Sequence, residues 1–209
     1  MRHASRTMTA AAILLVGTLL GGCGEAAPAD DPITFAVAGD SLTAWDNQTF
    51  PEPTGELDPV TWTHWVIADG LELAGGYARG FATARDVADA MVPVDADVLV
   101  VMVGTNDTGV TDTDAVLTSI EDIVNTAAIR SVVISAIPPD DGYADDALAF
   151  NEALSSFAAE RRWTFVDPWD GMRVDGRWGD GLSDDGIHPT ADAAKRAATV
   201  LARAIRDAA

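Results

Sequence analysis

Short apolar runs alternate along the chain with longer segments whose apolar residues recur every three or four positions. The run at residues 97–103 is apolar at nearly every position, as expected of a central strand that is covered on both faces. Four further runs predict strands, at residues 33–38, 73–78, 131–137 and 164–166. Helical spacing predicts the helices that follow, at 60–73, 84–91, 116–124, 147–157 and beyond Pro189. This alternation predicts one α/β domain, residues 33–209, with a parallel sheet covered by helices on both faces.

The first residues of the chain have the pattern of an export signal. Arg2 and Arg6 precede a short apolar stretch, and Leu20-Gly21-Gly22-Cys23 follows it. That stretch is shorter than the roughly 20 residues that a membrane-spanning helix needs. The leucine three residues before the cysteine resembles the bacterial lipobox, so we predict a lipoprotein-type signal at 1–22 and acylation of Cys23. The alternative is an ordinary cleaved signal whose cysteine is incidental. Small and acidic residues at 23–32 predict a flexible tether.

Charge and cysteine content limit the possible partners. The formal net charge is −20, whereas nucleic-acid binding requires clustered Lys and Arg to neutralise phosphates. The same charge disfavours docking of the domain itself on anionic lipid, so we expect contact with the membrane only through the lipid on Cys23. A strongly acidic surface repels other copies of itself, which predicts a monomer. Cys23 is the only cysteine, so the chain forms no internal disulfide.

Candidate catalytic residues follow the predicted strands. Ser41 comes directly after the first strand, in Gly39-Asp40-Ser41-Leu42-Thr43, and Asn106 follows the central strand. Because open parallel sheets bind ligands at the carboxyl ends of their strands, the two residues are expected at one edge of the sheet. A serine there can act as a nucleophile, and an asparagine side chain can donate a hydrogen bond to an oxyanion. Alone, each residue also fits a plain structural role, a helix cap for Ser41 and a turn for Asn106.

A general base is found by elimination among the three histidines. His3 lies in the predicted signal, and His64 lies between two tryptophans in a helical pattern, which favours a packing role. His188 remains, in a loop before the last helix, and Asp185 three residues earlier can orient its imidazole. Asp184 is a competing partner. A second alternative is a metal site made from the acidic residues of these loops and the histidine, namely Asp40, Asp184, Asp185 and His188.

Three sequence blocks together carry a resemblance to a known family. Residues 39–43, 104–107 (Gly-Thr-Asn-Asp) and 185–189 (Asp-Gly-Ile-His-Pro) resemble blocks of the SGNH, or GDSL-type, esterases and lipases in order and spacing. The resemblance spans nearly the whole chain from residue 33 onward. It implies a flavodoxin-like three-layer αβα fold with a five-stranded parallel sheet and no metal or other cofactor. It also implies a catalytic triad, Ser41, His188 and Asp185, and an oxyanion hole that includes the Ser41 amide and the Asn106 side chain.

The remaining oxyanion donor of the family, a backbone amide from a glycine block, is where this chain departs from the pattern. Members usually carry glycine directly before an Asp-Thr or Ala-Thr pair. Here Phe81 precedes Ala82-Thr83, and Gly80 lies one position earlier. The resemblance therefore leaves two candidates, the amide of Gly80 and that of Phe81, and we favour Gly80 because phenylalanine would crowd the pocket.

The residues favour a serine esterase that hydrolyses carboxylic esters at the cell envelope. A lysophospholipase or thioesterase would use the same residues on longer acyl chains. A glycan-binding surface module that kept the fold without catalysis is the main alternative from another class, although it would not require Ser41, Asn106, Asp185 and His188 together. A transport-associated binding lipoprotein fits less well, because the chain is short for two lobes and a hinge.

Overall fold

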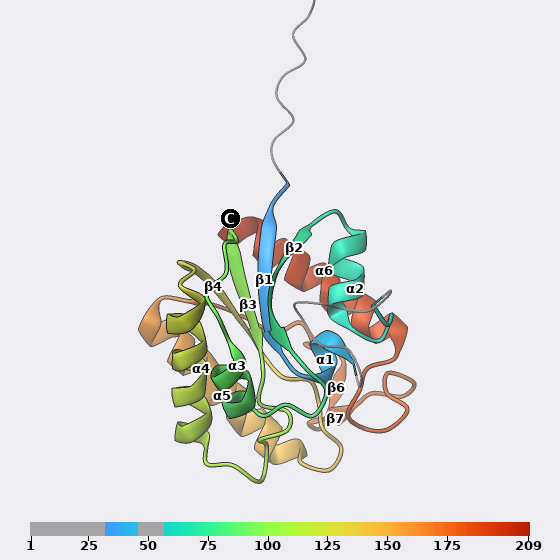
Figure 1. The fold of residues 1–209 in the computed structure, drawn as a ribbon. Helices are drawn as coiled ribbons and strands as arrows, with labels where there is room; N and C mark the ends of the chain where they lie inside the picture. The colour runs from blue at the N-terminus through green and yellow to red at the C-terminus, as the bar shows by residue number, and fades with distance from the viewer. Residues whose placement is uncertain (1–31, 46–56) are drawn as a thin grey trace, which may run out of the picture. The chain divides into compact units, whose positions relative to one another are not determined.

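A parallel five-stranded sheet forms the centre of the domain in the computed structural model, which describes residues 32–45 and 57–209 (Figure 1). The strands are β1 (Thr34–Gly39), β2 (Glu72–Ala78), β3 (Val98–Met102), β4 (Ser131–Ser135) and β5 (Thr164–Val166). They lie in the order β2-β1-β3-β4-β5, and every neighbouring pair is parallel. The predicted signal at 1–22, Cys23 and the predicted tether up to residue 31 lie outside the described residues.

Helices cover both faces of the sheet. They are α1 (Ser41–Ala44), α2 (Trp62–Ala68), α3 (Ala84–Ala90), α4 (Thr113–Ala127), α5 (Ala144–Arg161) and α6 (Ala191–Ala208). Figure 1 shows α2 and α6 on one side of the sheet and α3, α4 and α5 on the other.

Strand side chains alternate between two apolar cores, as the geometry of a strand requires. On β3, Val98 and Val100 pack in the core under α2 and α6, whereas Leu99 and Val101 pack in the core under α3, α4 and α5. Every residue of β3 is buried, which explains its uninterrupted apolar sequence. The sequence-based prediction of a three-layer αβα fold is confirmed.

Three local predictions differ from the structure. The helix expected at 60–73 ends at Ala68, because the following turn contains Gly70 with a φ of 91° and β2 begins at Glu72. Pro189 was expected in the first turn of the last helix, but it lies before the N-cap residue Thr190. A hairpin of two short strands, β6 (Arg173–Val174) and β7 (Arg177–Trp178), was not predicted.

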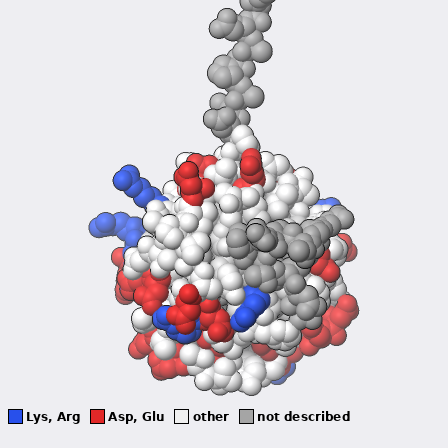
Figure 2. All heavy atoms as spheres, viewed as in Figure 1, with Lys and Arg blue, Asp and Glu red and all other residues white. Residues whose placement is uncertain are grey.

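Acidic residues outnumber basic ones, 33 to 13. Figure 2 shows Asp and Glu side chains at several places on one face of the molecule, with Lys and Arg in smaller number. Within the described residues, no helix combines the length and the apolar character needed to cross a bilayer. The described residues also hold no group of three or more His, Cys, Asp or Glu side chains arranged to bind a metal ion, so the alternative metal site gains no support.

Candidate active site

The carboxyl end of β1 presents Ser41 as the first residue of the one-turn helix α1. Asp40 caps this helix, because its Oδ1 accepts a hydrogen bond from the Leu42 amide at 3.0 Å. Gly39 is required by close packing, since a Cβ there would lie 2.1 Å from Oγ1 of Thr43. The carbonyl of Thr43 in turn accepts a hydrogen bond from the Thr63 hydroxyl at 2.6 Å, which ties α1 to α2. Ser41 therefore sits on a short, fully buried turn whose position is fixed from several sides.

Ser41 meets His188 although the two lie 147 residues apart in the sequence. The serine Oγ is 2.9 Å from Nε2 of the imidazole, and Nδ1 of the same ring is 2.7 Å from Oδ2 of Asp185. A carboxylate can only accept, so Nδ1 carries the hydrogen and Nε2 is left to accept from the serine hydroxyl. The three side chains form one continuous chain of hydrogen bonds from the serine hydroxyl to the carboxylate.

Asp185 is held by its own loop. Its Oδ1 accepts the backbone amides of Ile187 and His188 at 2.9 and 2.8 Å. Partial burial opposes ionisation, but the hydrogen bonds from the His188 side chain and from these amides lower the pKa of Asp185 to about 2. The carboxylate is therefore charged at any pH at which the protein would work. Asp184, the competing residue in the sequence, is exposed and makes no hydrogen bond to His188.

The loop that carries His188 is supported from the β4–α5 connection. The Asp141 amide donates to the Gly186 carbonyl at 2.9 Å, and Gly186 has a φ of 80°. A Cβ on Gly186 would lie 2.9 Å from the Cβ of Asp141. Asp141 also accepts the Trp178 amide at 2.9 Å, so one residue joins the loop that carries His188 to the β6–β7 hairpin. These contacts explain why the imidazole faces Ser41.

Asn106 lies in the loop after β3 and reaches toward the loop after β2. Its side-chain Nδ2 donates to the Ala82 carbonyl at 2.9 Å, which leaves the second hydrogen of that amide group for another acceptor. Arg79, which follows β2, donates its amide to the Gly39 carbonyl at 3.3 Å. Ser41, Asn106 and the turn after β2 are thus brought to the same end of the sheet, as the sequence predicts.

The turn after β2 contains both candidate backbone donors. The Ala82 amide donates to the Arg79 carbonyl at 3.2 Å, which places Gly80 and Phe81 at the two central positions. Phe81 has a φ of 63°, a value that the third position of a type II turn requires and that glycine adopts most easily. Within the described residues, the amides of Ser41, Gly80 and Phe81 donate no hydrogen bond. The Phe81 conformation thus places phenylalanine where the turn favours glycine.

This arrangement agrees with a family comparison. A sequence model of the GDSL-like lipase/acylhydrolase family matches residues 37–196, which include every candidate catalytic and oxyanion-binding residue described above. The chain belongs to this family. Membership makes it a hydrolase of carboxylic esters. No curated protein matches the sequence of this GDSL-like protein.

Solved structures of GDSL-like and other esterases share the fold. An aryl esterase from M. smegmatis has a TM-score of 0.63 at 19% identity, over 85% of this chain and 100% of its own. Est24, a carbohydrate acetylesterase from Sinorhizobium meliloti, has a TM-score of 0.62 at 18% identity, over 84% and 99%. A catalytic mutant of Axe2, an acetylxylan esterase from Geobacillus stearothermophilus, has a TM-score of 0.60 at 15% identity, over 83% and 94%.

Two buried carboxyl groups accompany the site of this GDSL-like hydrolase. Sequence reasoning gave Asp40 a place only in the alternative metal site and gave Asp107 no role. Asp40 is fully buried, and burial together with the neighbouring charge of Asp107 raises its pKa to about 7. Its Oδ2 and the Thr105 hydroxyl are buried close to each other, and Thr105 favours the ionised form of Asp40 too weakly to offset the burial. Burial also raises the pKa of Asp107, although its Oδ2 accepts the Ala84 amide at the start of α3 at 2.8 Å.

Trp45 is a further residue at the site that sequence reasoning missed. It follows α1 directly, and its amide donates to the Ser41 carbonyl at 2.9 Å. Its ring meets the His188 imidazole edge-on, with centroids 4.8 Å apart and an interplanar angle of 77°. The only signal in the sequence is a tryptophan four residues after the serine, which by itself is not specific.

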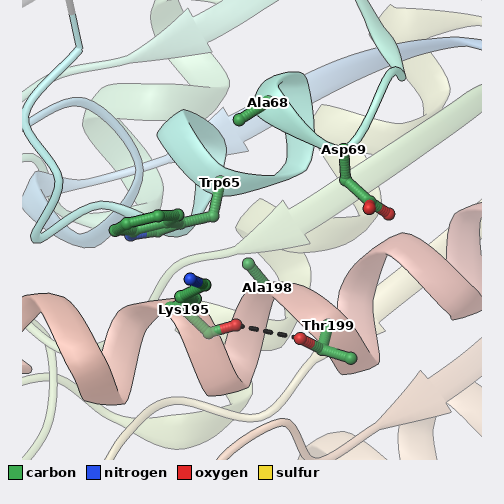
Figure 3. Close-up of a pocket in the computed structure, with 6 residues that line it drawn as sticks. All are labelled: Trp65, Ala68, Asp69, Lys195, Ala198 and Thr199. Carbon is green, nitrogen blue, oxygen red and sulfur yellow. Dashed lines mark hydrogen bonds between the residues drawn. The ribbon is translucent and has the colours of Figure 1, made fainter.

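A separate hollow of about 290 Å³ lies between α2 and α6 (Figure 3). In Figure 3 the Lys195 side chain points toward the Trp65 ring, and Nζ is 4.8 Å from the ring centroid. The hollow is lined by Trp65, Ala68, Asp69, Lys195, Ala198 and Thr199. It contains no residue of the candidate site, and Lys195 already has the indole as its partner.

Proposed function

We propose that this hydrolase cleaves esters through an acyl-enzyme formed on Ser41. The observation that carries the proposal is the hydrogen-bond chain from Oγ of Ser41 through His188 to Asp185, at 2.9 and 2.7 Å. His188 accepts the hydroxyl proton as Oγ attacks the acyl carbonyl carbon, and Asp185 stabilises the imidazolium. Collapse of the tetrahedral intermediate breaks the ester C–O bond, and His188 returns the proton to the leaving alcohol. Water then repeats the sequence on the acyl-enzyme and releases the acid.

The oxyanion of each intermediate would be bound by the Ser41 amide, the free hydrogen of the Asn106 side chain and one amide of the turn after β2. We assign that last donor to Phe81 in place of Gly80. The N–H of Phe81 belongs to the central peptide of the turn, and the turn's own hydrogen bond runs instead from the Ala82 amide to Arg79. Removal of a side-chain oxyanion donor, the role proposed for Asn106, typically lowers kcat by about 10²–10³-fold.

A fluorophosphonate probe tests the nucleophile, because it forms an Oγ–P bond with an activated serine and releases fluoride. Wild type should be labelled and Ser41→Ala should not. Ser119→Ala is the matched control, since Ser119 donates only to the Ala115 carbonyl within α4 and its loss should leave labelling intact. His188→Ala should lower ester hydrolysis by about 10⁴-fold or more. Labelling that survives in Ser41→Ala would remove the assignment.

The place of action is a separate part of the proposal. The signal-like residues 1–22 and Cys23 support export and a lipid anchor at the cell envelope, where acylated lipid or polysaccharide supplies esters. Cys23→Ser should move the protein from the membrane fraction to the soluble fraction without changing kcat on a small soluble ester. A variant that still sediments with membranes would contradict acylation of Cys23.

A further inference from the structure

Two aromatic residues near the candidate site hold backbone conformations that their side chains disfavour. Trp45 has a φ of 51° with a ψ of −175°, and Phe81 has a φ of 63°; bulky residues rarely adopt positive φ values of this kind. The other non-glycine residues with positive φ have ordinary explanations. Ala128 and Arg162 end α4 and α5, where left-handed caps are common, and Asp175 precedes Gly176 in the two-residue β6–β7 turn.

Trp45 lies on the side of the site from which the leaving alcohol departs. His188 must return its proton to the alcohol oxygen, and the Trp45 ring packs edge-on against that imidazole at 4.8 Å. The Ser41 carbonyl fixes the Trp45 amide at 2.9 Å, so the indole cannot move far without moving the nucleophile's helix. A group attached to the alcohol oxygen would therefore meet the indole.

Phe81 lies in the turn after β2, next to the proposed oxyanion donors. Its turn is joined to β1 through the Arg79 amide and to Asn106 through the Ala82 carbonyl. Phe81 is 73% exposed, so the residue gains little from packing in the protein. Glycine would relieve the backbone strain at no cost to the core. A phenyl ring that is strained, exposed and adjacent to the reaction centre is explained if its partner is the substrate.

We propose that Trp45 and Phe81 are specificity-determining residues that bind a flat, uncharged ring in the alcohol half of the ester. The proposal rests on the esterase function proposed above. An aromatic ring or the apolar face of a sugar ring would satisfy it, because both offer a flat apolar surface to an indole and a phenyl group.

Benzyl acetate and n-butyl acetate test the ring contact, because their alcohols are similar leaving groups and differ in the ring. Trp45→Gly and Phe81→Gly should each lower the benzyl-to-butyl ratio of kcat/KM by about 3- to 10-fold, mainly through KM, as expected for the loss of one ring contact. Arg162→Gly is the matched control, since it removes a large side chain at a φ of 61° away from the site and should leave the ratio unchanged. A methyl glucoside acetylated on one hydroxyl forms the third arm. If the two glycine variants lose more kcat/KM on this acetylated glucoside than on benzyl acetate, the ring that Trp45 and Phe81 bind is a sugar.

Equal losses on benzyl and butyl acetate in both glycine variants would overturn the proposal and make the rings structural. Binding of benzyl acetate to Ser41→Ala is measured by the broadening of the ester's NMR signals. Because this variant lacks the proposed nucleophile, the measurement reports binding without hydrolysis. Broadening that disappears with Phe81→Gly or Trp45→Gly supports the ring site even if wild type hydrolyses no ester, a result that would refute the proposed function alone. Absence of broadening in Ser41→Ala itself would refute the ring site.

Discussion

Replacement of Asp40 by asparagine is expected to make the protein more stable at neutral and alkaline pH. Asp40 is fully buried, and burial with the nearby Asp107 raises its pKa from 3.8 to about 7. Between these two values the unfolded chain has lost the proton and the folded chain has kept it, so the free energy of unfolding falls as the pH rises. The contribution is fully present below pH 3.8 and is lost as the pH passes through 7.

The size of the effect follows from the same two values. Each pH unit between them is worth about 1.4 kcal/mol, which gives a total loss of about 4 kcal/mol in wild type by pH 8. The asparagine side chain has no proton to lose in this range, so Asp40→Asn should escape this loss. The Oδ1 of the new amide can still accept from the Leu42 amide, and its Nδ2 can donate toward the Thr105 hydroxyl.

Urea unfolding at constant ionic strength, at pH values from 4 to 8, measures the difference in free energy of unfolding between the two proteins. An effect of the substitution on packing is present already at pH 4. The change with pH in the difference in free energy of unfolding therefore reports the ionisation of Asp40 alone. Asp112→Asn is the control, because Asp112 caps α4 in the same way at an exposed position. A difference between Asp40→Asn and wild type that stays constant from pH 4 to pH 8 would refute the reasoning.

Two further predictions concern the loop that carries His188. Gly186→Ala should lower both activity and stability, because the new Cβ would strain a φ of 80° and lie 2.9 Å from the Cβ of Asp141; normal kcat/KM and an unchanged melting temperature would contradict this. The pKa of Asp185 is lowered to about 2, so its stabilising contribution is present above pH 3.8 and lost as the pH falls toward 2. The stability advantage of wild type over Asp185→Asn should therefore shrink between pH 4 and pH 2 in acid unfolding, and an advantage that persists at pH 2 would argue against the contacts described.

The parts of the fold that could be predicted are those determined by burial. β3 is covered on both faces, so its sequence must be apolar throughout, and a parallel sheet follows from such strands when helices separate them. The β6–β7 hairpin was missed because each strand has only two residues, too few for an alternating pattern. Its Asp175-Gly176 turn was the available signal, since this pair favours a two-residue hairpin turn.

The side chains of the candidate site could be predicted because Ser41 and Asn106 follow predicted strands and because only three histidines compete for the role of base. His188 lies within hydrogen-bond distance of both Ser41 and Asp185. The backbone donor could not be predicted in the same way, because every residue except proline carries an N–H. The choice between Gly80 and Phe81 depends on φ and on the hydrogen bonds of one turn, which the sequence does not display.

Asp40, the residue before the proposed nucleophile, is an acidic residue whose carboxyl group does not oppose the reaction as long as it stays protonated. A carboxylate beside Ser41 would repel the negative charge that develops on the acyl oxygen, and the repulsion would be strong in a buried place. Burial that raises the pKa of Asp40 to about 7 leaves the group neutral over the acidic range, while its Oδ1 still caps α1 through the Leu42 amide. The free energy of unfolding that the protein loses on the alkaline side is then the consequence of placing a carboxyl group in the core, where burial disfavours its charged form.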